Sequence, residues 1–459
     1  MDYQEAVIYL DSFINYEKKS FWPYKQSLKL ERVKDFLNSI DSPHQNLNYL
    51  HIAGTKGKGS VCAFLSYILK EAGFKVGLYT SPHLTNFRER IRILDPDSQN
   101  LKSPTDSDFE GMISKSEVAE LVTELKPNIE RFNHKSRYGF LSFFEVYTTA
   151  ALLYFKKKKV DFAVLETGLG GRLDATNVVK PLACGITQIS YEHTQKLGNT
   201  LREIAGEKAG IIKDQSIIVS SPQEEEARVV IRQRCKNHNA KLYEVGRDIF
   251  FEDKGFDGTH QRFSVKGIYD EYKDLKTRLL GVHQIINVAT AIGILEVLRS
   301  YDISISSEAI REGLSKTFWP GRLEIISKDP FILLDGAQNI ASAKALKEAI
   351  KKYFNYKRLI LILGISKDKD IRGICDEFSE ISDEIILTKV NNLRAAEPEI
   401  IKSQIPNLKS QILLTKNSKE AIEIAKSRTE REDLILATGS LFLVGEVRKE
   451  LVEKKRSKR

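Results

Sequence analysis

Cysteine is scarce in this chain, and its few copies form no pattern. Four cysteines, Cys62, Cys184, Cys235 and Cys375, are scattered over 459 residues without a Cys-x-x-Cys pair. A disulfide framework or a structural zinc site needs cysteines at regular, close spacing, so the sequence argues against both. The four residues are expected to be reduced thiols.

Long apolar runs and the pattern of a signal peptide are also missing. No apolar run approaches the roughly 18 residues that a membrane-spanning helix requires. The first ten residues contain Asp2 and Glu5 and lack the pattern of a signal peptide. The sequence therefore predicts a cytoplasmic protein without a membrane partner.

The charge balance is basic, but no nucleic-acid-binding motif accompanies it. The net charge is +9, and no basic segment is interleaved with aromatic residues. Nucleic acid is therefore not expected as a partner, whereas small polyanions such as a nucleotide or a polycarboxylate fit the charge. A hydrophobic content of 41% supports a well-formed core.

The most informative segment is a glycine-rich loop, Gly54-Thr-Lys-Gly-Lys-Gly-Ser60, which follows an apolar run. Glycines let backbone N–H groups turn toward a phosphate, and residues 61–70 favour a helix whose N-terminus attracts anions. Lys58 would reach a terminal phosphate, and the Ser60 hydroxyl would hold Mg²⁺. The glycine spacing differs from the common P-loop pattern. A flexible glycine turn is the alternative interpretation.

Apolar runs alternate with helical segments along most of the chain. This alternation predicts a doubly wound, mostly parallel α/β sheet of the P-loop type. The strands are expected at 49–53, 75–79, 162–165 and 183–189, and helices at 144–155 and 201–209. Residues 95–116 are predicted to be an exposed excursion, and residues 241–280 a small antiparallel addition.

A second, smaller Rossmann-like α/β domain is expected to begin near residue 318. Its strands are predicted at 331–334, 359–363, 384–387, 411–414 and 434–437, and its helices include 341–353 and 418–427. Pro320 and Gly321 mark a linker between the two domains. The predicted domains are residues 1–317 and 318–459.

Polar residues follow several of the predicted strands, where α/β sheets bind their ligands. Glu166 is placed to bind Mg²⁺, and Asp174 and Asn177 follow within a glycine-containing turn. The alternative interpretation makes this segment a surface turn in which Asp174 caps a helix. His193 follows another strand, and this position favours a metal ligand over a structural histidine.

Lys208 lies on the helix after His193. A solvated helical lysine is the ordinary interpretation, but burial would lower its pKa and permit reaction with CO₂ to form a carbamate. Ser81, in Ser81-Pro-His-Leu84, is either a hydroxyl ligand near the metal or a turn residue. The segment Ser142-Phe-Phe-Glu145 places a carboxylate beside aromatic rings that stack on a flat ligand or belong to the core.

In the second domain, Asp335 follows a strand and opens a helix. It is predicted to accept a hydrogen bond from a nucleotide ribose or to bind the water of a cation. Arg322 in the linker would reach the phosphates and stabilise the charge that develops in phosphoryl transfer. These residues predict a site in a cleft between two domains.

Seven segments in this order resemble one family. They are Gly54 to Ser60, Ser81 to Leu84, Glu166-Thr-Gly-Leu-Gly-Gly-Arg-Leu-Asp-Ala-Thr-Asn177, Glu207-Lys-Ala-Gly-Ile-Ile-Lys213, Gly281-Val-His-Gln-Ile-Ile-Asn287, Trp319-Pro-Gly-Arg-Leu-Glu324 and Gly439-Ser-Leu-Phe-Leu-Val-Gly-Glu446. The ordered set resembles folylpolyglutamate synthase / dihydrofolate synthase, a family of the Mur ligase superfamily. The resemblance covers nearly the whole chain and implies the Mur ligase architecture.

The resemblance implies an ATP-dependent ligase that adds L-glutamate to dihydropteroate or to the glutamate chain of tetrahydrofolate through an acyl phosphate. It implies Mg²⁺, as two ions, and a carbamylated Lys208, with Lys58, Lys208, His193 and Arg322 as catalytic residues. The implied ATP contacts are Gly57, Lys58, Gly59, Ser60, Asn287, Arg322 and Asp335, and the implied metal ligands are Ser81, Glu166 and His193. The implied substrate contacts are Ser27, Leu28, Lys29, Leu30, Ser142, Phe143, Phe144, Glu145, Leu173, Asp174, Ala175 and Ser440. A monomer is expected.

Three residues depart from the family pattern. The family commonly has Asn where Lys56 stands, His where Gln338 stands and often Gly where Lys29 stands. Gln338 cannot take a proton, so an acid or base role there is in question. The alternatives are a Mur-type amide ligase with another carboxylate acceptor and a P-loop ATPase module without ligase activity.

Overall fold

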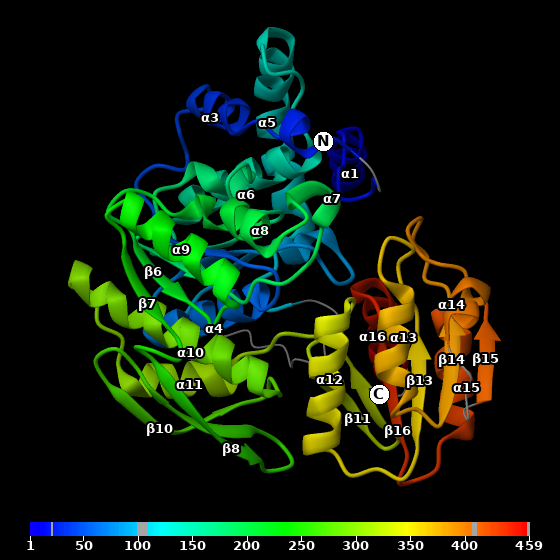
Figure 1. Ribbon diagram of the computed structural model, residues 1–459. Helices are drawn as coiled ribbons and strands as arrows, with labels where there is room; N and C mark the ends of the chain where they lie inside the picture. Colours follow the sequence, from blue (N-terminus) through cyan, green and yellow to red (C-terminus); the bar gives the residue numbers. More distant parts are fainter. Residues whose placement is uncertain (20–21, 99–108, 406–410, 457–459) are drawn as a thin grey trace.

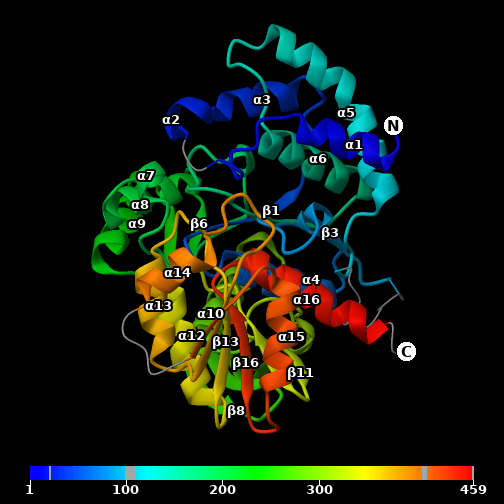
Figure 2. The same cartoon turned by 90° about the vertical axis from the view of Figure 1, so that its right-hand side faces the viewer.

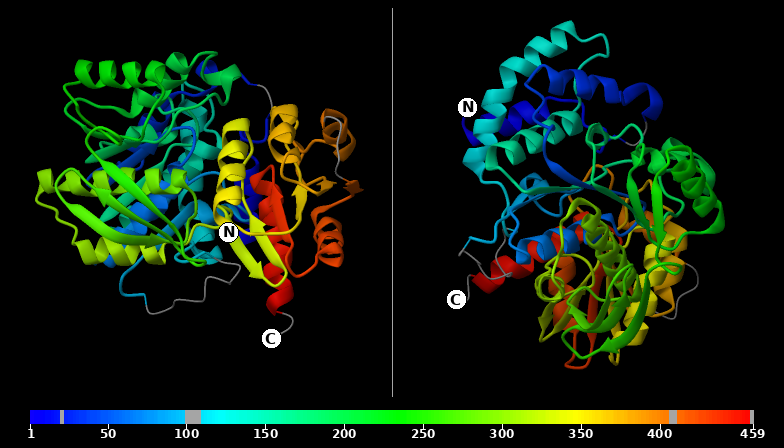
Figure 3. Two further views of the ribbon diagram at one scale, coloured as in Figure 1. Left: turned by 60° about the horizontal axis from the view of Figure 1, so that its bottom comes forward. Right: turned by 90° about the vertical axis from the view of Figure 1, so that its left-hand side faces the viewer.

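The computed structural model describes residues 1–19, 22–98, 109–405 and 411–456, which form two α/β units that lie side by side (Figure 1). The first unit comprises the elements from α1 to α11, and the second comprises β11 to α16. Figure 3 shows the two units from two further directions, each with its own sheet.

The sheet of the first unit has seven strands among the described residues, in the order β3-β2-β4-β1-β5-β6-β7. Neighbouring strands are parallel except β3, which is antiparallel to β2. The strands are β1 (Asn48–Ala53), β2 (Val76–Tyr79), β3 (Ile91–Leu94), β4 (Phe162–Glu166), β5 (Ala183–Ile186), β6 (Ile217–Ser220) and β7 (Lys241–Glu244).

Helices cover both faces of this sheet because the strands are buried on both sides. Along β1, Leu50 and Ile52 pack into one apolar cluster, and Tyr49 and Ala53 into clusters on the opposite face. The first face carries α4 (Lys58–Glu71), α10 (Val282–Glu296) and α11 (Ser307–Lys316), and the opposite face carries α6 (Phe143–Lys158), α8 (Leu201–Lys208) and α9 (Glu225–Asn237).

The outermost helices of the first unit pack on α6. As Figure 2 shows, α1 (Tyr3–Asp11) and α5 (Lys115–Lys135) lie side by side above it, with α3 (Leu30–Asn38) close by. Shorter helical segments connect these elements, namely α2 (Tyr24–Ser27), η1 (Phe87–Arg90), η2 (Ala175–Val178), α7 (Thr194–Leu197), η3 (Ala209–Ile211) and η4 (Val297–Tyr301).

An antiparallel three-stranded sheet completes the first unit. It contains β8 (Phe250–Phe256), β9 (Gln261–Lys266) and β10 (Glu271–Thr277) in the order β10-β9-β8. The predicted antiparallel addition is confirmed in kind. Its first segment, however, is β7, which pairs in parallel with β6 in the main sheet.

The second unit has its own sheet, in the order β11-β12-β16-β13-β14-β15 over the described part of the chain. Only β11 is antiparallel to its neighbour there. The strands are β11 (Glu324–Lys328), β12 (Phe331–Leu334), β13 (Leu359–Leu363), β14 (Glu384–Thr388), β15 (Gln411–Thr415) and β16 (Leu434–Thr438). One face packs on α12 (Ile340–Tyr353), α13 (Ile371–Ser379) and α14 (Pro398–Gln404), the other on α15 (Ser418–Arg428) and α16 (Leu441–Arg456).

Most strand predictions agree with the structure; one predicted strand is too long, and three strands were not predicted. The strand predicted at 183–189 ends at Ile186, and β3, β6 and β11 are additional strands. β3 and β11, the antiparallel strands of the two mostly parallel sheets, lie at sheet edges, where an alternating pattern is short and hard to recognise.

The predicted excursion at 95–116 is only partly exposed. Residues 99–108 lie outside the described residues, whereas Phe109 and Ile113 are buried and α5 begins at Lys115. Ile113 joins the core because its N–H donates to Ile91, which draws this segment along β3.

One helical stretch within the described residues is long and apolar enough to cross a membrane. It is Val282–Tyr301, formed by α10 and η4, and 78% of its most apolar window is buried inside the protein. The expectation of short apolar runs overlooked it because polar residues such as Gln284 and Asn287 interrupt it. Its burial between the two sheets of the first unit gives it the character of a core helix.

Candidate functional site

The glycine-rich loop connects β1 to α4, as predicted. Gly57 has a φ of 90°, and a Cβ atom there would lie 2.3 Å from Oδ1 of Asn287. Gly54 is equally constrained, because its Cβ would lie 1.8 Å from Oγ1 of Thr187. These positions therefore require glycine. The first N–H groups of α4, from Lys58 to Ser60, have no partner within the helix and are available to an anion.

Glu166 and Ser81 lie beside this loop at the ends of neighbouring strands. The Ser81 N–H donates to Oε2 of Glu166 at 3.1 Å, and Nζ of Lys58 lies 3.9 Å from Oε1. Burial raises the pKa of Glu166, and the charge of Lys58 acts against that rise. A buried carboxylate with so few donors fits a site for a hard cation, because carboxylate, hydroxyl and phosphate oxygens are the ligands that Mg²⁺ prefers.

His193 is the N-cap residue of α7. Among the described residues, no hydrogen bond or ion pair joins it to Ser81 or Glu166. His193 is exposed on one side, but the protein around the imidazole removes part of its hydration and lowers its pKa to about 3, so the ring is neutral and retains a lone pair for a metal. Its backbone has a φ of 53°, in the left-handed region. No group of three His, Cys, Asp or Glu residues converges in the described ranges, so a magnesium site here would depend on hydroxyl and phosphate oxygens.

Lys208, at the end of α8, points into the glycine-rich loop. Its Nζ donates to the Gly54 carbonyl at 2.7 Å, and its side chain is buried. Burial, followed by the charge of Lys58, lowers the pKa of Lys208 to about 7. Near neutral pH, a large fraction of this amine is unprotonated and therefore nucleophilic toward CO₂.

Two predicted ATP contacts, Arg322 and Asp335, flank the first two strands of the second unit, because Arg322 precedes β11 and Asp335 follows β12. Asp335 is partly exposed, and its two carboxylate oxygens accept the N–H groups of Leu323 and Ala337, each at 2.8 Å. Burial raises its pKa, and Arg322 opposes that rise, which places the two side chains near each other. Nη1 of Arg322 donates to the Gly321 carbonyl at 2.9 Å.

Asn287 and Ser440 are held within the protein. Nδ2 of Asn287 donates to Gln284 at 3.0 Å, and its Oδ1 faces Gly57 of the loop. Ser440 is 1% exposed, and its hydroxyl accepts the N–H of Leu443 at 3.2 Å near the start of α16.

Two of the implied substrate contacts, Ser27 and Glu145, meet at an arginine that sequence reasoning missed. Arg32 donates to the Glu145 carboxylate at 2.8 and 3.0 Å and to the Ser27 carbonyl at 2.9 Å. Ser142 and Glu145 form a capping box at the start of α6. Burial raises the pKa of Glu145, whereas Arg32 acts to lower it.

The segment around Asp174 is buried and partly structural. Asp174 caps η2 by accepting the Thr176 N–H at 3.0 Å, and it also accepts the Leu169 N–H at 2.8 Å. The helix-cap interpretation is therefore confirmed, but the segment is not a surface turn. Ala175 packs in the same cluster as Phe143, while Leu28, Leu169 and Leu173 border the cluster beneath α8.

Three other implied substrate contacts, Phe144, Lys29 and Leu30, lie in different surroundings from one another. Phe144 lies over Gly168, whose Cβ would come within 2.5 Å of the ring. Lys29 starts α3 without a side-chain cap and donates to the Lys25 carbonyl at 3.3 Å, while Leu30 is buried.

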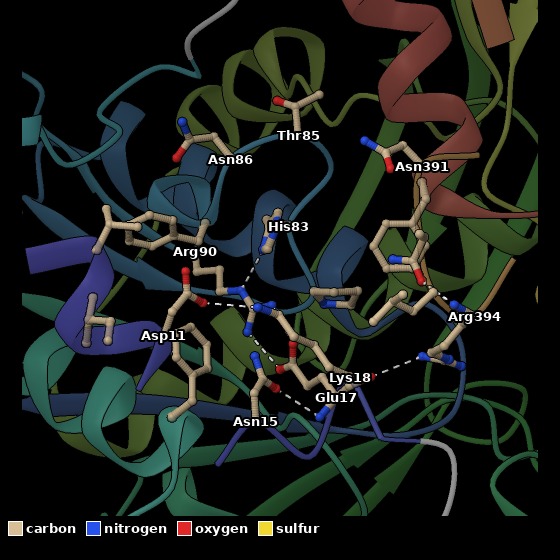
Figure 4. A pocket seen from close by; sticks show the side chains of 18 residues that line it. Asp11, Asn15, Glu17, Lys18, His83, Thr85, Asn86, Arg90, Asn391 and Arg394 are labelled. Carbon is tan, nitrogen blue, oxygen red and sulfur yellow. Dashed lines mark hydrogen bonds and ion pairs between the residues drawn. The ribbon is translucent and has the colours of Figure 1, made fainter. Parts of the chain in front are cut away.

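A cavity of about 510 Å³ lies where the N-terminal segment, the 82–90 segment and residues 391–394 of the second unit meet (Figure 4). Arg90 is 2% exposed and donates to both carboxylate oxygens of Glu17, at 2.8 and 2.6 Å, and to Nδ1 of His83 at 3.0 Å. Nη1 of Arg394 reaches the Glu17 carbonyl at 3.4 Å.

Of the residues predicted for the site, Phe143 alone is among those that line this cavity. The remaining lining residues were missed because they come from segments that are distant in sequence. The available signal was the charged run Phe87-Arg-Glu-Arg90, two residues after Ser81-Pro-His-Leu84.

Comparison with known proteins identifies both halves of the chain. Residues 132–295 match the Mur ligase middle domain, and residues 321–441 match the glutamate ligase domain of Mur ligases. The chain is similar to the dihydrofolate synthase/folylpolyglutamate synthase of Bacillus subtilis, with 36% identity over 92% of this chain and 94% of the relative.

Solved structures show the same similarity. The folylpolyglutamate synthase of Mycobacterium tuberculosis, complexed with ADP and AMPPCP, has a TM-score of 0.85 and 27% identity, covering 98% of this chain and 99% of that chain. A structure described as an FPGS–AMPPCP–folate complex has a TM-score of 0.82 and 28% identity, covering 98% of this chain and all of that chain.

Proposed function

The chain belongs to the folylpolyglutamate synthase / dihydrofolate synthase family of Mur ligases, and we propose that it ligates L-glutamate to dihydropteroate, to the glutamate chain of tetrahydrofolate, or to both. The reaction is an ATP-dependent amide ligation. The observation that carries the proposal is the convergence of Lys58, Glu166 and Lys208 on one glycine-rich loop at the start of α4.

This arrangement suits the activation of a carboxylate by ATP. The acceptor carboxylate attacks the γ-phosphorus, the bond to the β-γ bridging oxygen breaks, and ADP and an acyl phosphate form. The glutamate amine then attacks the acyl carbon, loses a proton and displaces inorganic phosphate. A free carboxylate is a poor electrophile, so the phosphate provides the leaving group that the amide bond requires.

Residues of the loop bind the nucleotide in this proposal. Gly57 to Ser60 donate backbone N–H groups to the phosphates, and the Lys58 ammonium balances their charge. Arg322 stabilises the charge that develops on the transferred group. Asn287 and Asp335 position the rest of the nucleotide.

Ser81, Glu166 and His193 would hold Mg²⁺, for which we propose two ions. The ions would neutralise phosphate charge when bound. Lys208, with its lowered pKa, is the proposed carbamylated residue. The carbamate formed on its amine would supply oxygen atoms close to Gly54. An unmodified amine at this position in a metal-loaded crystal structure would refute the carbamate.

The acid substrate is proposed to contact residues 27–30, 142–145 and 173–175. Arg32 contacts both Ser27 and Glu145, and Phe143 packs in the same apolar cluster as Ala175. These contacts support one continuous surface for the acid substrate. Ser440 would help to hold the incoming glutamate. Because its hydroxyl is buried, that role would need a rearrangement at the start of α16.

The domain boundary is proposed at residues 317/318, between α11 and β11. A cytoplasmic location is proposed as well, and it agrees with four buried free cysteines. We further propose a monomer without a nucleic-acid or membrane partner, which light scattering coupled to size-exclusion chromatography would test.

The deciding experiment is incorporation of labelled glutamate, dependent on ATP and Mg²⁺, with dihydropteroate and tetrahydrofolate as separate acceptors. Product from both acceptors establishes a bifunctional enzyme, and product from one assigns the synthase type. ATP hydrolysis without product from either acceptor would refute the proposed substrates and direct attention to Lys29 and Gln338.

A further inference from the structure

One buried carboxylate connects the two units beside the glycine-rich loop. Oε1 of Glu192 accepts hydrogen bonds from Lys56 at 2.9 Å and from Lys369 at 3.2 Å. The side chains of Glu192 and Lys369 are each 10% exposed, and that of Lys56 is 28% exposed. This is a largely desolvated ionic triad, unlike an ordinary surface pair.

Each member of the triad comes from a different segment. Lys56 belongs to the glycine-rich loop, Glu192 to the segment between β5 and α7, and Lys369 to the segment between β13 and α13 of the second unit. The first two segments are already joined, since Thr55 and Ser190 exchange two hydrogen bonds at 3.1 and 3.2 Å. Lys369 is therefore the member that adds a connection across the units.

The charges show why one carboxylate must hold both lysines. Lys58 and Lys208 also act electrostatically on this region, so cations outnumber the carboxylate. The Glu192 carboxylate contacts both Lys56 and Lys369 through its Oε1 atom and so offsets their two charges at one point. Without the Glu192 charge, Lys56 and Lys369 would repel each other across the boundary between the units.

We propose that Lys56, Glu192 and Lys369 form an interdomain ionic bridge that positions residues 366–370 of the second unit against the phosphate-binding loop during ligation. The three are positioning residues, because they act through the placement of Lys58 and Ser60. The proposal rests on the proposed ligase function. The bridge links the order of the phosphate loop to the approach of the domain that supplies the glutamate.

Another ion pair across the units provides a matched control. Lys352 of α12 donates to Asp253 of β8 at 2.5 Å, at a site formed by the antiparallel sheet. Lys352→Ala removes an ionic contact between the units without touching the phosphate loop. Lys367→Ala removes an exposed lysine from the same segment as Lys369.

The kinetic test uses Lys369→Ala, Lys369→Arg, Glu192→Gln and the double variant that combines Lys369→Ala with Glu192→Gln. The controls are Lys352→Ala and Lys367→Ala. We expect Lys369→Ala to lower the kcat of ligation about 10-fold, with more ATP hydrolysed per product and little change in melting temperature. Lys369→Arg should restore most of the rate, and the double variant should be no worse than Glu192→Gln. Equal effects of Lys369→Ala and Lys352→Ala, or additive effects in the double variant, would overturn the bridge.

A second measurement separates this proposal from the ligase assignment. All four native cysteines are buried, so cysteines introduced at the exposed Glu226 and Glu399 can carry a donor and an acceptor dye. With AMPPCP bound, Lys369→Ala should broaden the distance distribution between the units, whereas Lys352→Ala and Lys367→Ala should broaden it less. An unchanged distribution in Lys369→Ala refutes the bridge. A broadened distance distribution in Lys369→Ala, together with a wild-type protein that ligates no glutamate, refutes the proposed function alone.

Discussion

The buried amine of Lys208 gives a sharp prediction about stability and pH. In the protein without nucleotide, metal or CO₂, we expect Lys208→Met to raise the free energy of unfolding at pH 7 and to raise it by less at pH 9. The reason is that Lys208 is buried among positive charges, and its pKa is lowered from 10.5 to about 7.

The sign follows from proton binding. Between pH 7 and pH 10.5 the unfolded chain keeps a proton on Lys208 that the folded protein has released, so the free energy of unfolding rises with pH. The destabilisation is fully present below pH 7 and disappears as the pH approaches 10.5. The shift corresponds to about 5 kcal/mol at low pH and to about 2 kcal/mol at pH 9.

The variant loses the ionisation cost but also one hydrogen bond, the 2.7 Å contact with the Gly54 carbonyl. That bond contributes about 1 kcal/mol. The net gain of Lys208→Met over wild type is therefore about 3 kcal/mol at pH 7 and falls to about 1 kcal/mol at pH 9.

Urea unfolding in CO₂-depleted buffer at pH 7, 8 and 9 measures this difference. Lys180→Met, which removes an exposed lysine, controls for the loss of one positive charge. Parallel stability curves for wild type and Lys208→Met across this range would refute the argument, because they would show that Lys208 does not titrate there.

Three further outcomes follow from the same geometry. Lys58→Ala should abolish product formation while leaving the melting temperature near that of wild type, since the lysine serves a phosphate; matching losses of activity and stability would contradict this. Arg32→Met should destabilise the protein by about 3 kcal/mol, because it leaves the buried Glu145 carboxylate without its cation; a melting temperature equal to that of wild type would oppose it. Gly57→Ala should prevent AMPPCP binding in calorimetry, because the Cβ would meet Asn287 at 2.3 Å on a backbone with φ of 90°; wild-type affinity would refute the requirement for glycine.

The sequence by itself determined the architecture and the phosphate loop. Continuous apolar runs such as residues 359–363 identify buried parallel strands, because no polar face interrupts them. The loop from Gly54 to Ser60 was recognisable because its function depends on backbone conformation, which glycine spacing encodes directly. The short edge strands β3 and β11 lacked such a signal.

Only the tertiary structure decided which side chains meet. Arg32 and Glu145 are separated by 113 residues, and Glu192 and Lys369 by 177, yet both pairs are buried together. A charged residue in a sequence is expected to be solvated. Its burial becomes evident only when the structure shows the oppositely charged residue that packs against it. The pKa of Lys208 has the same origin, because desolvation depends on the elements packed around the amine.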